Sequence, residues 1–169
     1  MPRQMRRIVT GHDAQGKSVI VIDGPASAAQ AYWLTDSSPV DNLTPDDAAQ
    51  QVKGLEPPKN GSIFRFASIP PEDPKVSVAD RERAMAKAFE QMGAAHCRVD
   101  TSRDPGMHKT RTVDYVILLS GEVTLVLDKG EVDLKPFDVV VQRGTNHAWI
   151  NKGKEPALIA AVLVDAKDT

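Results

Sequence analysis

Two histidines and one carboxylate are the residues of this 169-residue chain whose types and positions best suit a chemical site. His108 and Asp114 lie six residues apart at the start of an apolar run, and His147 lies in the segment G-T-N-H-A-W-I-N. Two imidazoles and one carboxylate that converge can hold a divalent Fe, Mn, Zn or Ni ion and leave coordination positions open. Asp114 and His147 can also transfer protons, so we assign catalytic roles to both.

Strand geometry predicts how these side chains would meet. If residues 108–118 are extended, His108 and Asp114 point to the same face, because side chains alternate along a strand. The alternative for Asp114 is a structural role, accepting hydrogen bonds from nearby hydroxyls or an arginine. We expect no metal ligand at His12, in a turn, or at His96, beside Cys97. The side chains predicted to line the pocket are Thr110, Thr112, Gln142, Arg143 and Trp149, with Arg143 expected to meet a substrate carboxylate.

Short segments of period two surround these residues in the second half of the chain. They predict strands at 113–119, 122–127, 131–135, 138–142, 147–151 and 157–164. The turns between them contain S-G, D-K-G, R-G-T-N and N-K-G-K. Short strands with glycine-rich turns are typical of an antiparallel sandwich or barrel.

The first half of the chain mixes strands with two helices. Strands are predicted at 7–10 and 18–22, which form a hairpin, and at 31–34 and 62–69. A helix at 45–53 would begin at the N-cap Thr44, and a helix at 78–92 would begin with a capping box of Ser77 and Asp80. The apolar stripe Met85, Phe89 and Met92 is expected to pack on a sheet or on a partner subunit. We predict that residues 1–95 form an extension on the barrel or on a partner, that residues 96–169 form the barrel core, and that both make one structural domain.

The segment 106–151 resembles the cupin superfamily, whose members are small β-barrels of the jelly-roll type. The first cupin motif runs His-x-His, three or four residues, Glu, six residues, Gly. Here His108, Thr110, Asp114 and Gly121 stand at these positions.

The second cupin motif ends Pro-x-Gly, two residues, His, three residues, Asn. Gly144, His147 and Asn151 match it, and Gln142 stands at the proline position. The resemblance covers about the last 70 residues. It implies a mainly β, antiparallel jelly-roll barrel with N-terminal strands and one or two short helices.

The resemblance also implies a divalent metal, but two of the four ligand positions differ from the family pattern. Thr110 replaces an imidazole, and Asp114 is one methylene shorter than the usual Glu. A three-ligand site of His108, Asp114 and His147, completed by water or substrate, is one interpretation. The other is a barrel that has lost its metal and keeps an organic pocket.

The resemblance therefore implies a small-molecule enzyme, for which we predict a non-redox lyase. A decarboxylase or dehydratase acting on an aromatic, polyketide-like or organic-acid metabolite fits the missing third imidazole. The alternatives are a dioxygenase with a two-histidine, one-carboxylate site and a metal-free small-molecule binding protein.

Composition excludes several other classes. The 21 basic residues are balanced by 23 acidic ones and are scattered, which disfavours nucleic-acid binding. We expect no membrane span, because no apolar run is long enough, and a cytoplasmic location, because the single Cys97 cannot form an intrachain disulfide. We also expect a homodimer in which the first hairpin or the strand at 62–69 extends the neighbour's sheet.

Overall fold

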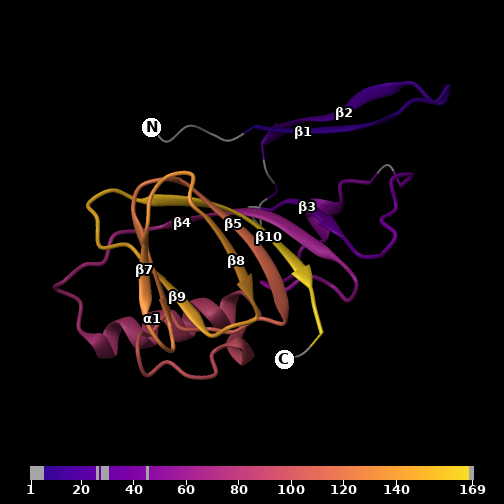
Figure 1. Ribbon diagram of the computed structural model, residues 1–169. Coiled ribbons are helices and arrows are strands. Elements are labelled where there is room, and N and C mark those ends of the chain that lie inside the picture. The colour runs from indigo at the N-terminus through magenta and orange to yellow at the C-terminus, as the bar shows by residue number, and fades with distance from the viewer. Residues whose placement is uncertain (1–5, 26, 28–30, 45, 168–169) are drawn as a thin grey trace.

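The period-two segments of the sequence are β-strands in a computed structural model of the protein, which describes residues 6–25, 27, 31–44 and 46–167 (Figure 1). The strands are β1 (Arg6–His12), β2 (Ser18–Pro25), β3 (Ala31–Thr35), β4 (Ser62–Ile69), β5 (Thr112–Ser120), β6 (Val123–Leu127), β7 (Glu131–Leu134), β8 (Val139–Arg143), β9 (His147–Ile150) and β10 (Ala157–Asp165). The helical elements are α1 (Val78–Gln91) and the short 3-10 helices η1 (Ala48–Gln51) and η2 (Ala95–Cys97).

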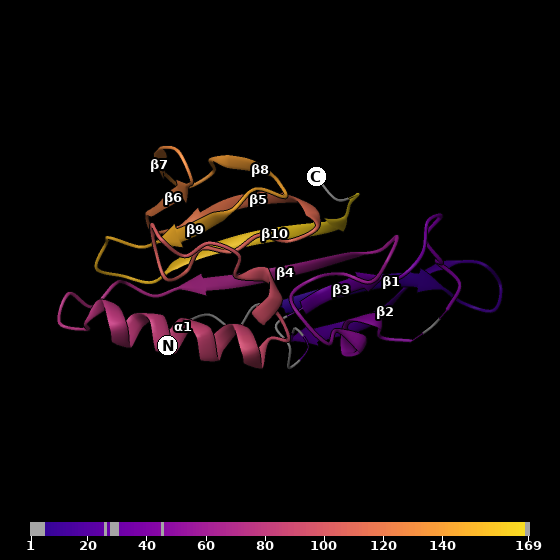
Figure 2. The ribbon, with the colours of Figure 1, turned by 90° about the horizontal axis from the view of Figure 1, so that it is seen from below.

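Two antiparallel sheets enclose the core. The larger sheet has the order β3-β4-β10-β5-β8, and the smaller has the order β7-β6-β9. Figure 2 shows the small sheet and β8 stacked on one side of β10 and β4, with α1 on the other side of β4. The predicted mainly β, antiparallel jelly-roll class is confirmed. The strands β3 and β4 come from the first half of the chain and complete the larger sheet.

The inward face of β5 changes from polar to apolar along the strand. Its side chains alternate between buried and more exposed, and the inward set includes Thr112, Asp114, Val116 and Leu118. The apolar core consists of Val116, Leu118, Val123, Leu125, Leu134, Ala157, Ile159, Ala161 and Leu163. One end of the barrel is therefore filled with hydrocarbon, and the other end holds polar side chains.

The predicted helix at 45–53 is wrong in extent. Only η1 is helical there, and its N-cap is Asp47, whose side chain accepts a hydrogen bond from the Ala49 amide. The hydroxyl of Thr44, the expected cap, donates instead to Asp41, which removes it from the helix end. Pro45 lies outside the described residues.

The predicted helix at 78–92 is confirmed. The Ser77 hydroxyl accepts a hydrogen bond from the Asp80 amide at 3.1 Å, and Gly93 follows the helix with a φ of +65°. Of the apolar stripe, only Phe89 is buried, whereas Met85 and Met92 remain 40% and 36% exposed. The helix lies across the lower end of the barrel in Figure 1, and Phe89 is its buried residue.

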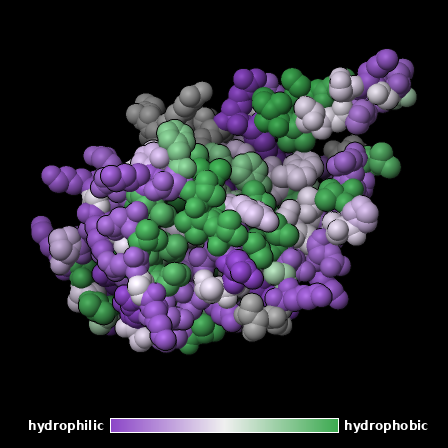
Figure 3. Space-filling view, in the orientation of Figure 1, coloured by the Kyte–Doolittle hydropathy of each residue, from purple (hydrophilic) through white to green (hydrophobic). Residues whose placement is uncertain are grey.

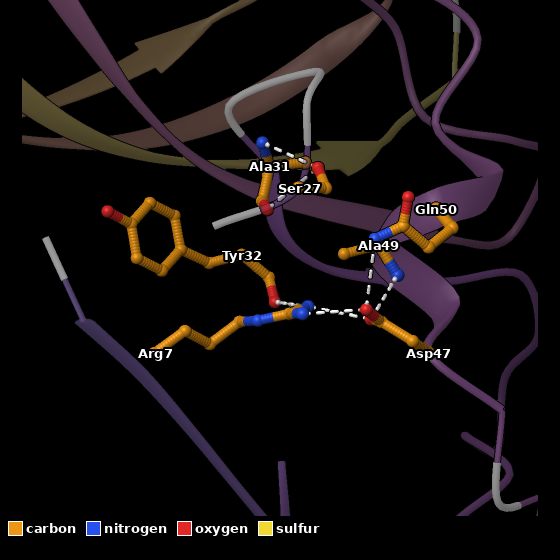
Figure 4. Close-up of polar contacts among 7 residues, drawn as sticks. All are labelled: Arg7, Ser27, Ala31, Tyr32, Asp47, Ala49 and Gln50. Atoms are coloured by element: carbon orange, nitrogen blue, oxygen red, sulfur yellow. Dashed lines mark hydrogen bonds and ion pairs between the residues drawn. The ribbon is translucent and has the colours of Figure 1, made fainter. Parts of the chain in front are cut away.

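The β1–β2 hairpin is attached to the rest of the chain by a buried arginine. Both terminal nitrogens of Arg7 donate to the carboxylate of Asp47 at 2.6 Å, and one also donates to the Tyr32 carbonyl at 3.2 Å (Figure 4). Beyond this contact the hairpin extends away from the barrel (Figures 1 and 2). The strand β4 pairs with β10 along its whole length and with β3 over residues 62–65, so the first half of its other edge is already occupied within its own chain.

Candidate active site at the polar end of the barrel

The two predicted histidine ligands are neighbours. His108 precedes β5 and forms an isolated bridge with His147 on β9, with reciprocal backbone hydrogen bonds of 2.9 Å. Their ring centroids lie 4.3 Å apart, and the His147 side chain is almost fully buried. The backbone pairing therefore brings together two imidazoles that are far apart in the sequence.

Backbone carbonyls determine the tautomers of both rings. The Nδ1 atom of His108 lies 2.8 Å from the Gly106 carbonyl oxygen, and Nδ1 of His147 lies 2.9 Å from that of Thr145. Because a carbonyl can only accept, each Nδ1 carries a proton and donates it, and each Nε2 keeps its lone pair. Nδ1–H donation to a carbonyl is also what orients metal-binding histidines.

The surroundings keep both imidazoles neutral. The Phe89 ring lies 4.9 Å from the His108 ring, and the Trp149 ring meets the His147 ring edge-on at 5.5 Å. Burial lowers the pKa of His108, and burial together with the adjacent His108 lowers the pKa of His147 to about 3. The pair therefore presents two basic nitrogens that stay unprotonated at neutral pH.

Gln142, at the proline position of the cupin motif, supports His147. Its side-chain amide donates to the carbonyl oxygen of Thr145 at 3.0 Å and also contacts the Thr145 hydroxyl. The same carbonyl accepts the His147 Nδ1–H, so Gln142 holds the acceptor that orients the ring. Arg143, next in the chain, is exposed and lines the same cavity as Thr110 and Thr112.

Asp114 occupies the predicted inward position on β5 and is 6% exposed. Thr110 and Thr112 are joined by a 2.7 Å hydrogen bond between their hydroxyls, and Thr112 in turn hydrogen bonds Asp114. The other carboxylate oxygen, Oδ1, is buried without a partner. Burial raises the pKa of Asp114 to about 6, although Thr112 and the charge of Arg65 oppose the shift.

Arg65 on β4 points into the barrel, and the sequence analysis did not predict it as a site residue. One terminal nitrogen donates to the Gly54 carbonyl at 2.8 Å, while Nε is buried without a partner. Burial lowers the pKa of this guanidinium, and the charge of Asp114 opposes that shift. Ala161, the β10 neighbour of Arg65, is small and leaves room for the long side chain. The alternation in S-I-F-R-F-A-S-I was the signal that could have found it, since Arg65 shares parity with the buried Ile63.

The structure does not gather the predicted ligand set around one point. Among the described residues, the group of three or more His, Cys, Asp or Glu side chains with all ligand atoms within 4.8 Å of one another is Glu56, His96 and Cys97. His108 and His147 are brought together, but Asp114 does not join them at that distance. Of the described His, Cys, Asp and Glu residues, none adds a third ligand atom to the two imidazoles at that distance, so the ligand role of Asp114 stays a prediction.

The Glu56, His96 and Cys97 cluster lies at the mouth of the barrel. It borders a cavity of about 440 Å³ that Glu56 and His96 share with Thr110, Thr112 and Arg143, among others. Sequence reasoning missed this cluster, because Glu56 comes from a loop and lies 40 residues from His96.

Comparison with known proteins agrees with the fold. The family model of the cupin domain matches residues 95–164. The phomopsin biosynthesis cluster protein C' of Diaporthe leptostromiformis is 32% identical, with 89% of this chain and 72% of that protein covered. The cupin-domain-containing oxidoreductase srdD of Neurospora crassa is 29% identical, with 98% and 78% covered. A cupin 2 conserved barrel domain protein from Salinispora arenicola aligns with a TM-score of 0.39 at 16% identity, covering 62% of this chain and 64% of that one.

The fold defines a single-barrel β protein with polar side chains at one end. The chain belongs to the cupin superfamily. Its relatives include cupin-domain oxidoreductases and proteins of biosynthesis clusters, which indicates a cupin-type enzyme. Within the described residues, no helix has both the length and the hydropathy needed to cross a membrane.

Proposed function

We propose that the protein is a small-molecule enzyme that transfers protons to and from an organic anion held in the barrel, as a decarboxylase or dehydratase does. The observation that carries this proposal is the partly buried Arg65 and the buried Asp114, which face the same interior as two neutral imidazoles. A desolvated cation, a carboxyl group whose pKa is raised to about 6 and two neutral imidazole bases together suit acid–base chemistry.

Arg65 would bind the anionic part of the substrate. Desolvating a guanidinium nitrogen is costly unless it is paired, and here the buried Nε has no partner and Asp114 forms no direct ion pair with Arg65 among the described contacts. A substrate carboxylate or phenolate would accept hydrogen bonds from Nε and the terminal nitrogens. The binding group is therefore Arg65, rather than the exposed Arg143 that the sequence favoured.

Asp114 and His147 would exchange protons with the bound substrate. In a dehydration, Nε2 of His147 removes a proton from carbon, and the carboxyl of Asp114 gives its proton to the departing hydroxyl group, which leaves as water. In a decarboxylation, the carbon–carbon bond breaks, CO₂ leaves, and the electron pair on carbon takes the proton of Asp114. Both routes need a carboxyl group that keeps its proton at a higher pH than an ordinary aspartate, and burial raises the pKa of Asp114 to about 6.

A redox enzyme is the second candidate, and the names of three relatives favour it. The relatives from Neurospora crassa, Hypocrea virens and Aspergillus ruber are called cupin-domain-containing oxidoreductases. In that case His108 and His147 would supply two ligands to a redox metal, and substrate or water would complete the set.

Turnover assays separate these candidates. We would incubate the protein with a panel of aromatic and β-hydroxy carboxylic acids, with and without chelator, and follow O₂ consumption and loss of CO₂ or water by mass spectrometry. Turnover without O₂ consumption supports the lyase. Product formation matched by O₂ consumption contradicts it in favour of the oxidoreductase, and saturable binding without turnover contradicts it in favour of a binding protein.

Two variants test the assigned roles. Asp114→Asn should lower kcat about 100-fold or more, because the amide cannot transfer the proton. Arg65→Gln should raise KM about 10-fold or more, through the loss of charge-assisted hydrogen bonds. The exposed Arg83 on α1 provides the matched control, Arg83→Gln, which should leave both constants unchanged. Equal effects of the Arg65 and Arg83 variants would contradict the assignment of Arg65.

We also propose that a second copy of the chain binds across the outer face of the larger sheet. Tyr115, Ile117, Val139 and Val141 of β5 and β8 are exposed, and Figure 3 shows the hydrophobic patch across this face. The β1–β2 hairpin supplies a second exposed apolar surface, and a two-stranded hairpin is marginally stable alone. If the hairpin of one copy packed on the patch of the other copy, both apolar surfaces would be covered.

A further inference from the structure

We propose that Glu56, His96 and Cys97 form a zinc site at the mouth of the barrel, separate from the His108–His147 pair. The carboxylate comes from the loop after η1, and the imidazole and thiol come from η2. The ligand atoms of all three lie within 4.8 Å of one another. This site does not depend on the chemistry proposed for Arg65 and Asp114.

The distances suit a tetrahedral zinc ion. Nε2 of His96 lies 3.5 Å from Sγ of Cys97 and 2.8 Å from Oε2 of Glu56. Two such ligands at about 2.0 and 2.3 Å from a tetrahedral zinc lie about 3.5 Å apart, which the nitrogen–sulfur distance already matches. The nitrogen–oxygen contact would have to widen by about 0.5 Å, which a carboxylate on a surface loop can do.

The protons of the cluster cannot satisfy every contact. Nε2 of His96 faces both the Glu56 carboxylate and the Cys97 thiol, so it either donates to the oxygen or accepts from the sulfur. One of the two contacts is left without its hydrogen bond. A divalent cation at the centre of the three atoms would interact favourably with all of them, with Cys97 bound as the thiolate.

Neighbouring backbone groups hold two of the ligands in place. The Arg111 amide donates to Oε1 of Glu56 at 2.8 Å, which leaves Oε2 for the cluster. The Lys109 amide donates to the Cys97 carbonyl at 2.8 Å and ties η2 to the segment before β5. Such outer hydrogen bonds orient metal ligands and strengthen binding.

The fourth coordination position would open toward solvent. Cys97 is buried, whereas the His96 side chain is 65% exposed and Glu56 borders the cavity of about 440 Å³. Three protein ligands with one open position are typical of zinc sites that bind a further ligand. Lys109, Arg143 and Lys167 also line the cavity, so the chemistry favours a small anion as that ligand.

Metal titration of the full chain tests the site. We expect one Zn²⁺ per chain by calorimetry, and with Co²⁺ a thiolate-to-cobalt charge-transfer band that reports the Cys97 ligand. His96→Ala and Cys97→Ser should each weaken Zn²⁺ binding more than about 10-fold, and Cys97→Ser should also abolish the charge-transfer band. His96 is exposed, so its substitution is not expected to affect folding, and thermal unfolding of the metal-free variant checks this.

Two controls distinguish this site from others. His12→Ala, at an exposed histidine of β1, and the His108→Ala, His147→Ala double variant should both retain Zn²⁺ binding and the cobalt band. Binding that is lost in the double variant and kept in His96→Ala would overturn the proposal. A chain that binds less than stoichiometric Zn²⁺ and shows no thiolate band would also overturn it, whatever the outcome of the turnover assays.

Discussion

Replacing Asp114 by asparagine should change how the stability of the protein depends on pH. Burial raises the pKa of Asp114 in the folded chain from its ordinary value of 3.8 to about 6. Between these two values the unfolded chain has lost this proton while the folded chain still holds it. The free energy of unfolding therefore falls as the pH rises through this window, and the loss is complete above the folded pKa. Asparagine does not titrate, so the variant lacks this contribution.

The expected size follows from the shift. A difference of about two pKa units corresponds to about 3 kcal/mol of free energy of unfolding. Asparagine keeps the shape of the side chain and can still accept a hydrogen bond from Thr112. Relative to the wild type, Asp114→Asn should therefore gain between about 1 and 3 kcal/mol when the pH is raised from 4 to 8.

Urea unfolding of both proteins at pH 4, 6 and 8 measures this gain. Chelator is present throughout, so that bound metal does not contribute. His147 also titrates abnormally, with its pKa lowered to about 3, and the comparison of variant with wild type at each pH removes most of that contribution. The exposed Asp36 offers the matched control Asp36→Asn, which makes the same substitution on the surface rather than inside the barrel. A constant difference between Asp114→Asn and wild type would refute the claim that the barrel holds a desolvated carboxyl group.

Three further predictions concern stability and assembly. Gly121→Ala should lower the free energy of unfolding by about 2–4 kcal/mol, because a Cβ there would lie 2.7 Å from the Ala157 backbone. Gly130→Ala, also at positive φ but with open space around it, should lower it by about 1 kcal/mol. Equal losses for the two variants in urea titrations would contradict the steric argument. Asp47→Asn should cost about 1–3 kcal/mol in the same assay by leaving Arg7 without its anion, and an unchanged midpoint would show that the hairpin anchor contributes nothing. Light scattering should give a dimer mass for the wild type and a monomer mass for Ile20→Lys in the hairpin, and a monomeric wild type would rule out the proposed dimer.

Much of the fold could be read from local patterns. Each of the six C-terminal strands occurs within one or two residues of its predicted position, because alternation of apolar side chains directly reflects burial of one face of a sheet. The cap Ser77 and the stop Gly93 likewise predicted α1, since capping depends on neighbours in the sequence. The helix expected at 45–53 failed for the opposite reason. Asp47 there is bound by Arg7, which lies 40 residues away, and no local pattern contains that contact.

The sequence by itself determined the barrel and the inward direction of Asp114, and it predicted His108 and His147 as site residues. Only the tertiary structure decided which polar groups share the interior. Arg65 and Asp114 face the same interior because β10 pairs with β4 on one side and with β5 on the other, and the register of those pairings is a property of the whole sheet.

The same reason accounts for the cluster at the barrel mouth. Glu56 reaches His96 and Cys97 because an amide of the segment before β5 holds its carboxylate. Hydrophobic alternation is a short-range signal, but the position of a ligand in space depends on contacts between segments that are distant in the chain.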